Sequence, residues 1–279
     1  MPATDMLERL KDNLADNRIE IDGEVYHVVE GDLLVDEDQL GLYAEQRALL
    51  EAEAQVKRQL AALGAPRLAL ENQGALVGIM QGGKLVRWQP GLVLTYAVLR
   101  QTFGNEMEYQ LASRSMQEAT QAWEETCGIR FSHSSQFDNS NGTQVADVVF
   151  TVRKIDAGGR FIASAFFPND PPPRRRVFLD PSFFANDLPF DRTGVLRHEL
   201  GHVLGFRHEH IRSGAPPVCP REDLGETIDL TKYDPRSVMH YFCGGVGTRE
   251  LRITDLDRAG AQQLYGPPLQ DHEAFAFVA

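Results

Sequence analysis

The sequence predicts a mixed α+β fold, and three observations carry this prediction. Apolar, β-branched and aromatic residues gather in short runs such as 92–99, bounded by Pro and Gly, which is typical of strands. In residues 105–128 the apolar residues recur at helical spacing, which predicts one long helix. Residues 192–204 carry two histidines four positions apart, which share one face if this segment is a second helix.

The first 80 residues are predicted to form a separate N-terminal region. Residues 5–17 and 41–63 are rich in helix-forming residues, and residues 24–29 between them have the composition of a strand. Residues 1–74 hold 16 Asp and Glu against 7 Lys and Arg, a net charge of −9 that leaves −3 for the rest of the chain. This asymmetry indicates two parts with different roles, at 1–80 and 81–279.

The elements of the second part follow in order. After a glycine-punctuated junction at 64–83, strands are predicted at 84–88 and 92–99. Asn105 can cap the long helix, with Glu108 three positions further on. The buried stripe of this helix is predicted to be Ala112, Met116, Ala119, Trp123 and Cys127. Further strands are predicted at 129–134, 146–152, 158–168 and 177–180, and a last helix at 255–266.

A candidate metal site lies at His198-Glu199-Leu200-Gly201-His202-Val203-Leu204-Gly205-Phe206-Arg207-His208, which has the pattern H-E-x-x-H-x-x-G-x-x-H. On a helix, His198 and His202 can bind one zinc ion together. Gly205 can adopt the left-handed conformation that ends a helix, so that His208 returns to the same ion. Three neutral imidazoles leave a fourth position for water, which is the mark of a catalytic zinc rather than a structural one.

Glu199 follows the first of these histidines and is the candidate general base and acid. Zinc makes its bound water acidic near neutral pH, and a nearby carboxylate can take that proton and pass it to a leaving amine. This is the chemistry of peptide hydrolysis. The alternative is that the histidines lie on a solvated helix and bind nothing.

The motif resembles the metzincin signature. The continuation Gly205-Phe206-x-His208-Glu209-His210 is similar to the astacin family, and Ser237-Val238-Met239-His240-Tyr241 resembles its methionine turn. Trp88 with Leu94-Thr95-Tyr96, the strand at 158–168 and the last helix are similar to matrixins. The resemblance implies a zincin domain with a mostly parallel five-stranded sheet, an antiparallel edge strand, long helices and a small C-terminal subdomain.

The resemblance also implies roles for individual residues. Met239 packs beneath the zinc ligands, and Tyr241 lies near the metal and stabilises the developing oxyanion. His210 and His240 are interpreted as hydrogen-bonding or exposed residues and not as ligands. Val29-x-Gly31-Asp32-x-Leu34 resembles the astacin propeptide motif F-x-G-D-x-I, which implies that Asp32 closes the zinc site and keeps it latent. The alternative for Asp32 is a solvated Gly-Asp turn.

Cysteine content and charge restrict the remaining possibilities. Of the three cysteines, Cys219 and Cys243 could form a disulfide, and Cys127 is interpreted as a buried apolar residue. The net charge of −12 argues against nucleic acid as a partner. No apolar run approaches the roughly 20 residues that span a bilayer. The chain shows no signal peptide, but the resemblance implies a secreted or extracellular protein.

The sequence therefore predicts a metalloendopeptidase that cleaves protein or peptide substrates with one zinc ion. The zinc helix is expected at about 192–204 and the methionine turn at 237–241, with the N-terminal region as an intramolecular inhibitor. The alternative is a protein on the same fold that holds zinc without turnover and acts as a binding or inhibitory protein.

Overall fold

The computed structural model describes residues 3–62, 76–81, 84–143, 145–212, 215–219 and 227–269. Residues 3–62 are called the N-terminal unit below, and the described residues from 76 onward are called the main unit. Most of the predicted junction at 64–83 and the chain beyond residue 269 lie outside the described residues. None of the helices in these ranges has the length and apolar character needed to cross a membrane.

The main unit is built on a five-stranded sheet, and its strand order is β7-β6-β8-β10-β9. The strands are β6 (Val93–Val98), β7 (Arg130–His133), β8 (Phe150–Lys154), β9 (Ala163–Ser164) and β10 (Arg176–Leu179). Strands β7, β6, β8 and β10 run parallel, and β9 pairs antiparallel with β10 at one edge. The mostly parallel sheet with an antiparallel edge strand is therefore present as predicted.

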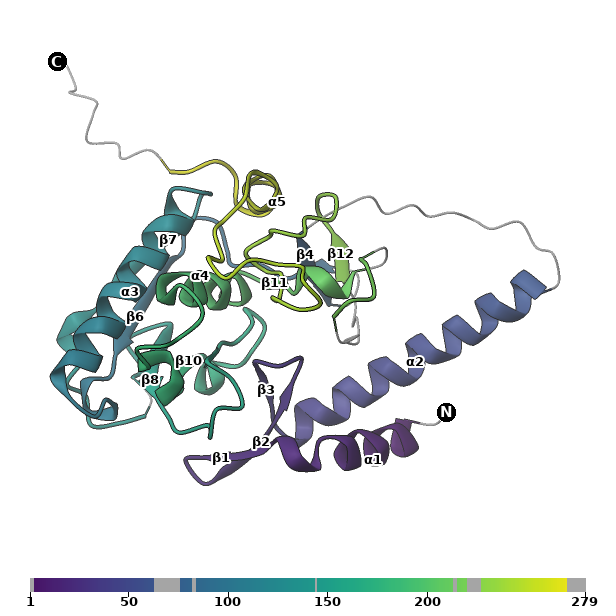
Figure 1. Cartoon of the computed structure of the whole chain (residues 1–279), viewed down its shortest axis with the longest axis horizontal. Helices are drawn as coiled ribbons and strands as arrows, with labels where there is room; N and C mark the ends of the chain where they lie inside the picture. Colours follow the sequence, from purple (N-terminus) through teal and green to yellow (C-terminus); the bar gives the residue numbers. More distant parts are fainter. Residues whose placement is uncertain are drawn as a thin grey trace, which may run out of the picture.

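Two helices, α3 (Glu106–Glu124) and α4 (Arg192–Val203), cover one face of this sheet (Figure 1). The cap predicted for α3 is formed, because the Asn105 side chain accepts a hydrogen bond from the Glu108 amide at 3.0 Å. The predicted stripe is fully buried in the core, and Trp123 also donates its indole N–H to the Arg197 carbonyl at 2.8 Å. This bond fixes α3 against the helix that carries the candidate zinc ligands.

The N-terminal unit packs against β8 and β10 on the opposite face of the sheet. It contains an antiparallel sheet of β1 (Arg18–Ile21), β2 (Glu24–Val29) and β3 (Leu33–Val35). On β10, Val177 and Leu179 point into the core beneath the helices, whereas Phe178 points the other way, as alternation along a strand requires. Phe178 joins Ala157 and Phe161 of the main unit in an apolar cluster with four residues of the N-terminal sheet: Ile19, Ile21, Tyr26 and Val28.

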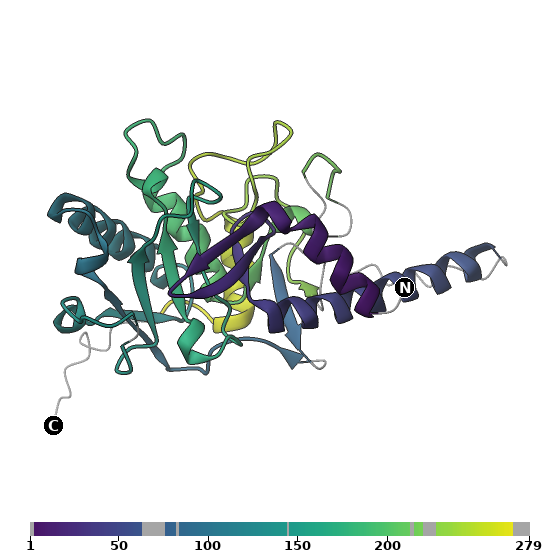
Figure 2. The ribbon, with the colours of Figure 1, turned by 90° about the horizontal axis from the view of Figure 1, so that it is seen from below.

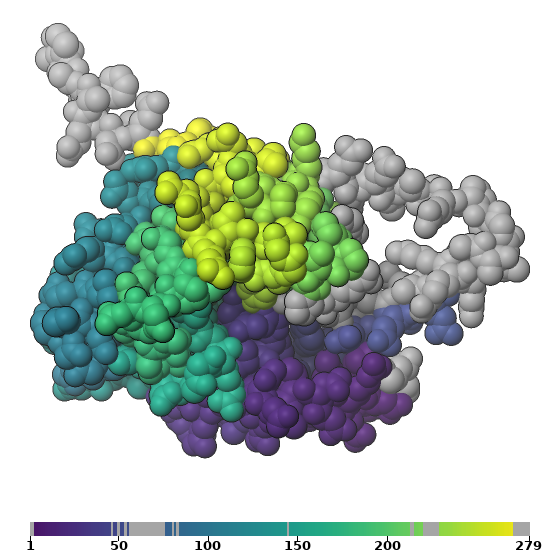
Figure 3. All heavy atoms as spheres, in the orientation of Figure 1, coloured from purple at the N-terminus to yellow at the C-terminus, as the bar shows by residue number. Residues whose placement is uncertain are grey.

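Two helices complete the N-terminal unit, α1 (Ala3–Asn13) and α2 (Glu37–Ala62), which lie side by side (Figure 2). They pack through Met6, Leu10, Leu40, Ala44 and Ala48. The first predicted helix is too long, because the chain turns at Ala15–Asn17 and enters β1. The space-filling view shows the N-terminal residues lying against the parts of the main unit coloured teal and green (Figure 3).

A second, smaller sheet lies beside the zinc helix. Its strand β4 (Val77–Gln81) pairs antiparallel with β11 (Phe206–Arg207), β12 (Thr227–Asp229) and β5 (Lys84–Leu85). Leu76 is fully buried in the core against Gly260 of the last helix, α5 (Asp255–Tyr265). Residues 76–81 are thus packed with the main unit, although the predicted boundary at residue 80 assigns most of them to the N-terminal region.

Candidate metal centre

Helix α4 presents His198 and His202 on one buried face. The helix begins at the N-cap Asp191, whose carboxylate accepts a hydrogen bond from the Gly194 amide. The Nδ1 atom of His198 lies 2.7 Å from the Val238 carbonyl, and Nδ1 of His202 lies 2.8 Å from the Phe206 carbonyl. A carbonyl can only accept, so each Nδ1 carries a hydrogen and the ring is held with Nε2 facing the cluster. This ring orientation is the one in which Nε2 of both histidines could bind the same ion.

The chain returns His208 to the same point through a turn at Gly205. Gly205 has a φ of +93°, and a Cβ atom there would lie 2.9 Å from the Val86 carbonyl oxygen. At the end of α4 the indole of Trp88 donates to the Val203 carbonyl at 2.7 Å, which satisfies one of the terminal acceptors. His208 is fully buried, and its Nε2 lies 3.1 Å from Nε2 of His202.

Asp32 enters this cluster from the tip of the β2–β3 hairpin. Glu30 and Gly31 both have a positive φ, +53° and +88°, so the chain reverses tightly and directs Asp32 inward. The Asp32 carboxylate lies 3.2 Å from Nε2 of His198 and 3.2 Å from Nε2 of His208. Asp32 is 8% exposed, which contradicts the alternative of a solvated Gly-Asp turn.

The donor set fits a zinc ion. One ligand atom from each of Asp32, His198, His202 and His208 lies within 4.8 Å of the others, and all four residues are buried. The Nε2 atoms of His202 and His208 lie 3.1 Å apart, a separation that two ligand atoms of one zinc ion can have. Three imidazole nitrogens and one carboxylate oxygen are ligands that zinc prefers.

The ionisation of the cluster supports the same assignment. Burial opposes ionisation of Asp32, but His208 and the hydrogen bonds from the histidines outweigh it and hold the pKa of Asp32 well below its usual range. Burial lowers the pKa of His202 to about 4, so this imidazole is neutral and available as a ligand at neutral pH. An anionic Asp32 and a neutral His202 are protonation states that metal binding needs.

Glu199 lies next to the cluster and is 2% exposed. Its Oε2 atom has no hydrogen-bond partner among the described residues. Burial and the neighbouring Asp32 carboxylate raise the pKa of Glu199 well above its usual range. A buried carboxyl group with a raised pKa and a free oxygen is suited to proton transfer.

The segment 237–241 forms a tight turn beneath the histidines, in which the His240 amide donates to the Ser237 carbonyl at 3.0 Å. Met239 is fully buried, and its sulfur lies so close to Gly201 of α4 that a Cβ atom there would overlap it. The turn also supplies the Val238 carbonyl that orients His198. Residues 237–241 therefore form a turn that packs against α4 through Met239 and Gly201.

Tyr241 reaches from the same turn to the hairpin that carries Asp32. Its hydroxyl donates to the Glu30 carbonyl, and its ring centre lies 4.2 Å from that of His208. A Cβ atom at Gly31 would lie 2.8 Å from the Tyr241 hydroxyl, so glycine is needed there on two grounds, its φ and this contact. The N-terminal unit thus occupies the side of the cluster that Tyr241 faces.

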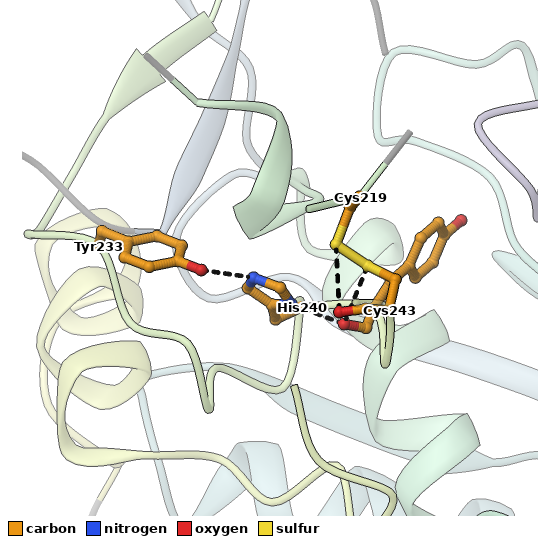
Figure 4. The surroundings of a disulfide bond; sticks show 5 residues. Cys219, Tyr233, His240 and Cys243 are labelled. Atoms are coloured by element: carbon orange, nitrogen blue, oxygen red, sulfur yellow. Dashed lines mark hydrogen bonds between the residues drawn. A yellow bond between two sulfur atoms is a disulfide. The ribbon is translucent and has the colours of Figure 1, made fainter. Parts of the chain in front are cut away.

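A disulfide joins Cys219 to Cys243 beyond the turn, with Cα atoms 5.3 Å apart (Figure 4). Beside it, the His240 ring lies 2.9 Å from the Tyr233 hydroxyl and 2.7 Å from the Tyr241 carbonyl. His210 and His240 are both buried, so of the two predicted alternatives exposure does not apply, and His240 makes hydrogen bonds. Cys127 is fully buried, and burial raises the pKa of its thiol to about 12.

A cavity of about 450 Å³ opens beside Glu199 and His198. Its walls are mainly apolar and include Phe190, Val195 and Leu251. Ile162 and Ala163, which lead into the edge strand β9, also line it. The strand at 158–168 therefore flanks the cluster as predicted, although only Ala163–Ser164 pair with the sheet.

Two residues that support the site were not singled out from the sequence. Asp257 of α5 accepts from the Ser237 hydroxyl at 2.5 Å and from the Val238 amide at 2.8 Å, so it holds the methionine turn in place. In the sequence, Thr254 and Asp257 have the spacing of a capping box, which could have indicated that the Asp257 carboxylate is held at the start of α5. Glu30 pairs with Arg207, next to His208. The excess of acidic residues before position 75 indicated that this region could pair with basic residues, but it did not identify Glu30 or Arg207.

Comparison with known proteins bears on residues 87–215, which match the matrixin family model. Matrix metalloproteinase-16 of Rattus norvegicus and that of Mus musculus are each 24% identical over 174 residues. This alignment covers 56% of the present chain and 24% of each relative, so the chain spans about a quarter of the length of these proteins. The Homo sapiens protein of the same name is 23% identical over 174 residues.

Two solved structures are also similar to the chain. Myroilysin is 18% identical with a TM-score of 0.47, over 66% of this chain and 97% of its own. High choriolytic enzyme 1, a hatching enzyme zinc-protease from Oryzias latipes, is 18% identical with a TM-score of 0.40, over 65% of this chain and 94% of its own. His198, Glu199, His202 and His208 all lie within the stretch that is similar to the matrixin family model.

Proposed function

We propose that this protein is a zinc metalloendopeptidase that its own N-terminal unit keeps latent. The observation that carries the proposal is the convergence of His198, His202 and His208 on one point, with Asp32 on the fourth side. The three histidines would hold one zinc ion, and Asp32 would take the position that the attacking water needs. When bound, the ion supplies a positive charge that brings the pKa of a coordinated water near neutrality.

The chain's own residues perform the proton transfers and hold the substrate. Glu199 takes a proton from the attacking water and passes it to the leaving amine, for which its raised pKa is suited. Tyr241 donates its hydroxyl to the developing oxyanion once the Glu30 carbonyl no longer accepts it. The edge strand β9 pairs with the extended substrate through main-chain hydrogen bonds, and the apolar cavity takes a substrate side chain.

Activation requires the β2–β3 hairpin to leave. Asp32 and the Glu30 carbonyl contact the two groups that the reaction needs, the metal position and the Tyr241 hydroxyl. A cut in residues 63–75 would separate the N-terminal unit from β4, which stays paired with β11 and β12. The disulfide and the family resemblance support a secreted protein that works in an oxidising compartment.

The experiment compares the intact chain with a chain cut in residues 63–75 and freed of the N-terminal unit, using casein as substrate. We expect activity in the cut protein and none in the intact one. Glu199→Gln in the cut protein should lower kcat by at least about 100-fold, the range for a lost general base, at unchanged zinc content. Near-normal activity of Glu199→Gln would refute the proposed mechanism.

The alternative function, a zinc-holding protein without turnover, is favoured by the buried position of Asp32 in the cluster. It predicts that the cut protein, free of the N-terminal unit and loaded with one zinc ion, cleaves no peptide bond. Zinc content and peptidase activity of the same sample therefore separate the two functions.

A further inference from the structure

Two buried arginines on the outer face of the main sheet share one carboxylate of the N-terminal unit. Arg153 of β8 donates to both oxygens of Asp22 at 2.8 and 3.0 Å, and Arg176 of β10 lies 3.7 Å from the same carboxylate. Arg176 also donates to the Tyr26 hydroxyl at 2.6 Å. The two arginines are 4% and 7% exposed, and among the described residues no other carboxylate pairs with them.

A third arginine lies in the same groove. Arg174 pairs with Asp36, and Arg174 and Arg176 line one open groove together with Asp22 and Asp36. Its walls come from both units, with carboxylates on the N-terminal side and guanidinium groups on the other. Arg153, Arg174 and Arg176 are called the arginine patch below. Residues 174–176 therefore do not form a solvated basic loop, because Arg176 is buried and Arg174 is paired.

Two arginines of the patch, Arg153 and Arg176, are held in part by the main unit itself. The guanidinium groups of Arg153 and Arg176 lie 5.4 and 5.1 Å from the ring centre of Phe178, at a distance typical of cation–π contact. Arg153 also donates to the Thr143 carbonyl. If the N-terminal unit leaves, Arg153 and Arg176 keep their contact with Phe178, but the three arginines lose Asp22, Asp36 and the Tyr26 hydroxyl. Neighbouring guanidinium groups that lose these partners attract other anionic groups.

We propose that the arginine patch then binds acidic segments of protein substrates. The inference rests on the proposed function, because it needs the N-terminal unit to leave and a substrate to enter. The occupant seen here indicates the chemistry: carboxylates, from Asp22 in the β1–β2 turn and Asp36 just before α2, pair with the three guanidinium groups. Arginine suits this task because its planar fork binds carboxylates in a bidentate manner, as Arg153 binds Asp22.

The patch is within reach of a substrate that also occupies the metal centre. Asp36 follows Asp32 by four residues, so the backbone between them spans at most about 14 Å. Asp32 lies at the histidines and Asp36 pairs with Arg174, so a substrate segment of similar length can reach both places. Asp22 precedes Asp32 by ten residues through strand β2, which allows at most about 36 Å. Acidic residues should therefore promote cleavage when they lie several positions from the scissile bond, and short peptides should not benefit.

Binding is tested first, without turnover. The probe is a labelled peptide of about fifteen residues with glutamates at one end, compared with the same peptide carrying glutamines. The protein is the zinc-loaded Glu199→Gln chain, cut in residues 63–75 and freed of the N-terminal unit. We expect the acidic peptide to bind about tenfold more tightly at low ionic strength, with the difference lost near 0.5 M salt. The uncut chain should show no difference, because the patch is covered.

Turnover is tested next with the cut parent protein. The readout is the ratio of kcat/KM for the acidic peptide to kcat/KM for the neutral one. Arg174→Gln with Arg176→Gln should lower this ratio about fivefold to tenfold. The matched control is Arg252→Gln, since Arg252 is an exposed arginine that pairs with Glu250 outside the patch and should leave the ratio unchanged.

The outcomes separate this inference from the proposed function. No cleavage of either peptide refutes the proposed function. Cleavage of both with a ratio near one in the parent, insensitive to salt, overturns the arginine patch alone. The arginine patch is likewise overturned as a substrate site if the N-terminal fragment rebinds the patch as an inhibitor but the acidic peptide does not bind. The salt dependence of the parent decides the matter even if the double variant does not fold.

Discussion

At the scale of single residues, the site depends on a few positions where only one side chain fits. Gly201 leaves room for the Met239 sulfur, and Gly31 leaves room for the Tyr241 hydroxyl. Residues of the site were predictable where a local sequence pattern contains them, as with His198, Glu199 and His202 on one helix. Asp257 was not, because its role depends on which turn the last helix meets, and no local spacing encodes that contact.

Replacing Gly205 by alanine should destabilise the main unit by about 1–3 kcal/mol, because φ is +93° and a Cβ atom would crowd the Val86 carbonyl. Thermal unfolding of the intact chain measures the effect. Gly41→Ala is the matched control, since Gly41 lies within α2 and an added Cβ atom there meets nothing within 4 Å. It should be neutral or stabilise by about 0.5–1 kcal/mol. Equal effects of the two substitutions would contradict the role of Gly205.

Replacing Asp32 by alanine should raise the activity of the intact chain, since the carboxylate would no longer occupy the fourth side of the cluster. The activity should stay below that of the cut protein, because the Glu30 carbonyl still holds the Tyr241 hydroxyl. Peptidase assays on intact and cut forms of both proteins check this. An Asp32→Ala chain as inactive as the parent would contradict the latency role.

At the scale of elements, the sequence predicted what local periodicity determines. The strand near 92–99, the long helix and its cap, and the zinc helix were foreseen because their apolar spacing and caps are local. Strand β8 was placed too early, since it begins at Phe150 rather than at residue 146. Strand β4 was missed. Apart from the two-residue strand β5, its partners β11 and β12 follow it by more than 100 residues, and pairing over such a distance leaves no local pattern.

The place of the cut should therefore matter. A chain cut just before Leu76 keeps β4 paired with β11, next to His208, and should keep its fold and its zinc. A chain cut after Gln81 and freed of everything before the cut loses β4 and the buried Leu76. It should unfold at a lower temperature, because losing one buried leucine alone costs about 2–5 kcal/mol. Equal unfolding temperatures for the two products would contradict the assignment of β4 to the main unit.

At the scale of the whole molecule, the uneven charge of the sequence has a structural meaning. Asp22, Glu30 and Asp36 of the acidic N-terminal unit pair with arginines of the main unit. The asymmetry indicated two parts with different roles, but it could not identify the pairs, which are set by how one sheet packs on the other. The apolar cluster around Phe178 adds a second component to the same interface.

The interface should weaken in acid. The hydrogen bond from Arg153 lowers the pKa of Asp22 below its ordinary value of 3.8, with burial acting in the opposite direction. A depressed pKa in the bound state means that Asp22 stabilises the interface above pH 3.8 and that this contribution is lost as the pH falls through the depressed value. In the cut protein, the dissociation constant of the N-terminal fragment from the main unit should therefore rise as the pH falls below 3.8 and through the depressed pKa of Asp22.

Asp22→Asn provides the control, because asparagine cannot titrate. We expect the variant fragment to bind more weakly than the parent near neutral pH, and the two to converge in acid. Fluorescence anisotropy of the labelled fragment measures both curves. Parallel curves for parent and variant down to the lowest pH at which the main unit stays folded would contradict the assigned role of Asp22.

The central claim is that three histidines of the main unit and one carboxylate of the N-terminal unit bind a single metal ion. A crystal of the intact chain, measured on both sides of the zinc absorption edge, tests it most directly. We expect one anomalous peak at about 2.0–2.2 Å from Nε2 of His198, His202 and His208 and from a carboxylate oxygen of Asp32. A crystal grown with excess zinc that shows no peak among these histidines, or histidine rings turned away from one another, would contradict the account.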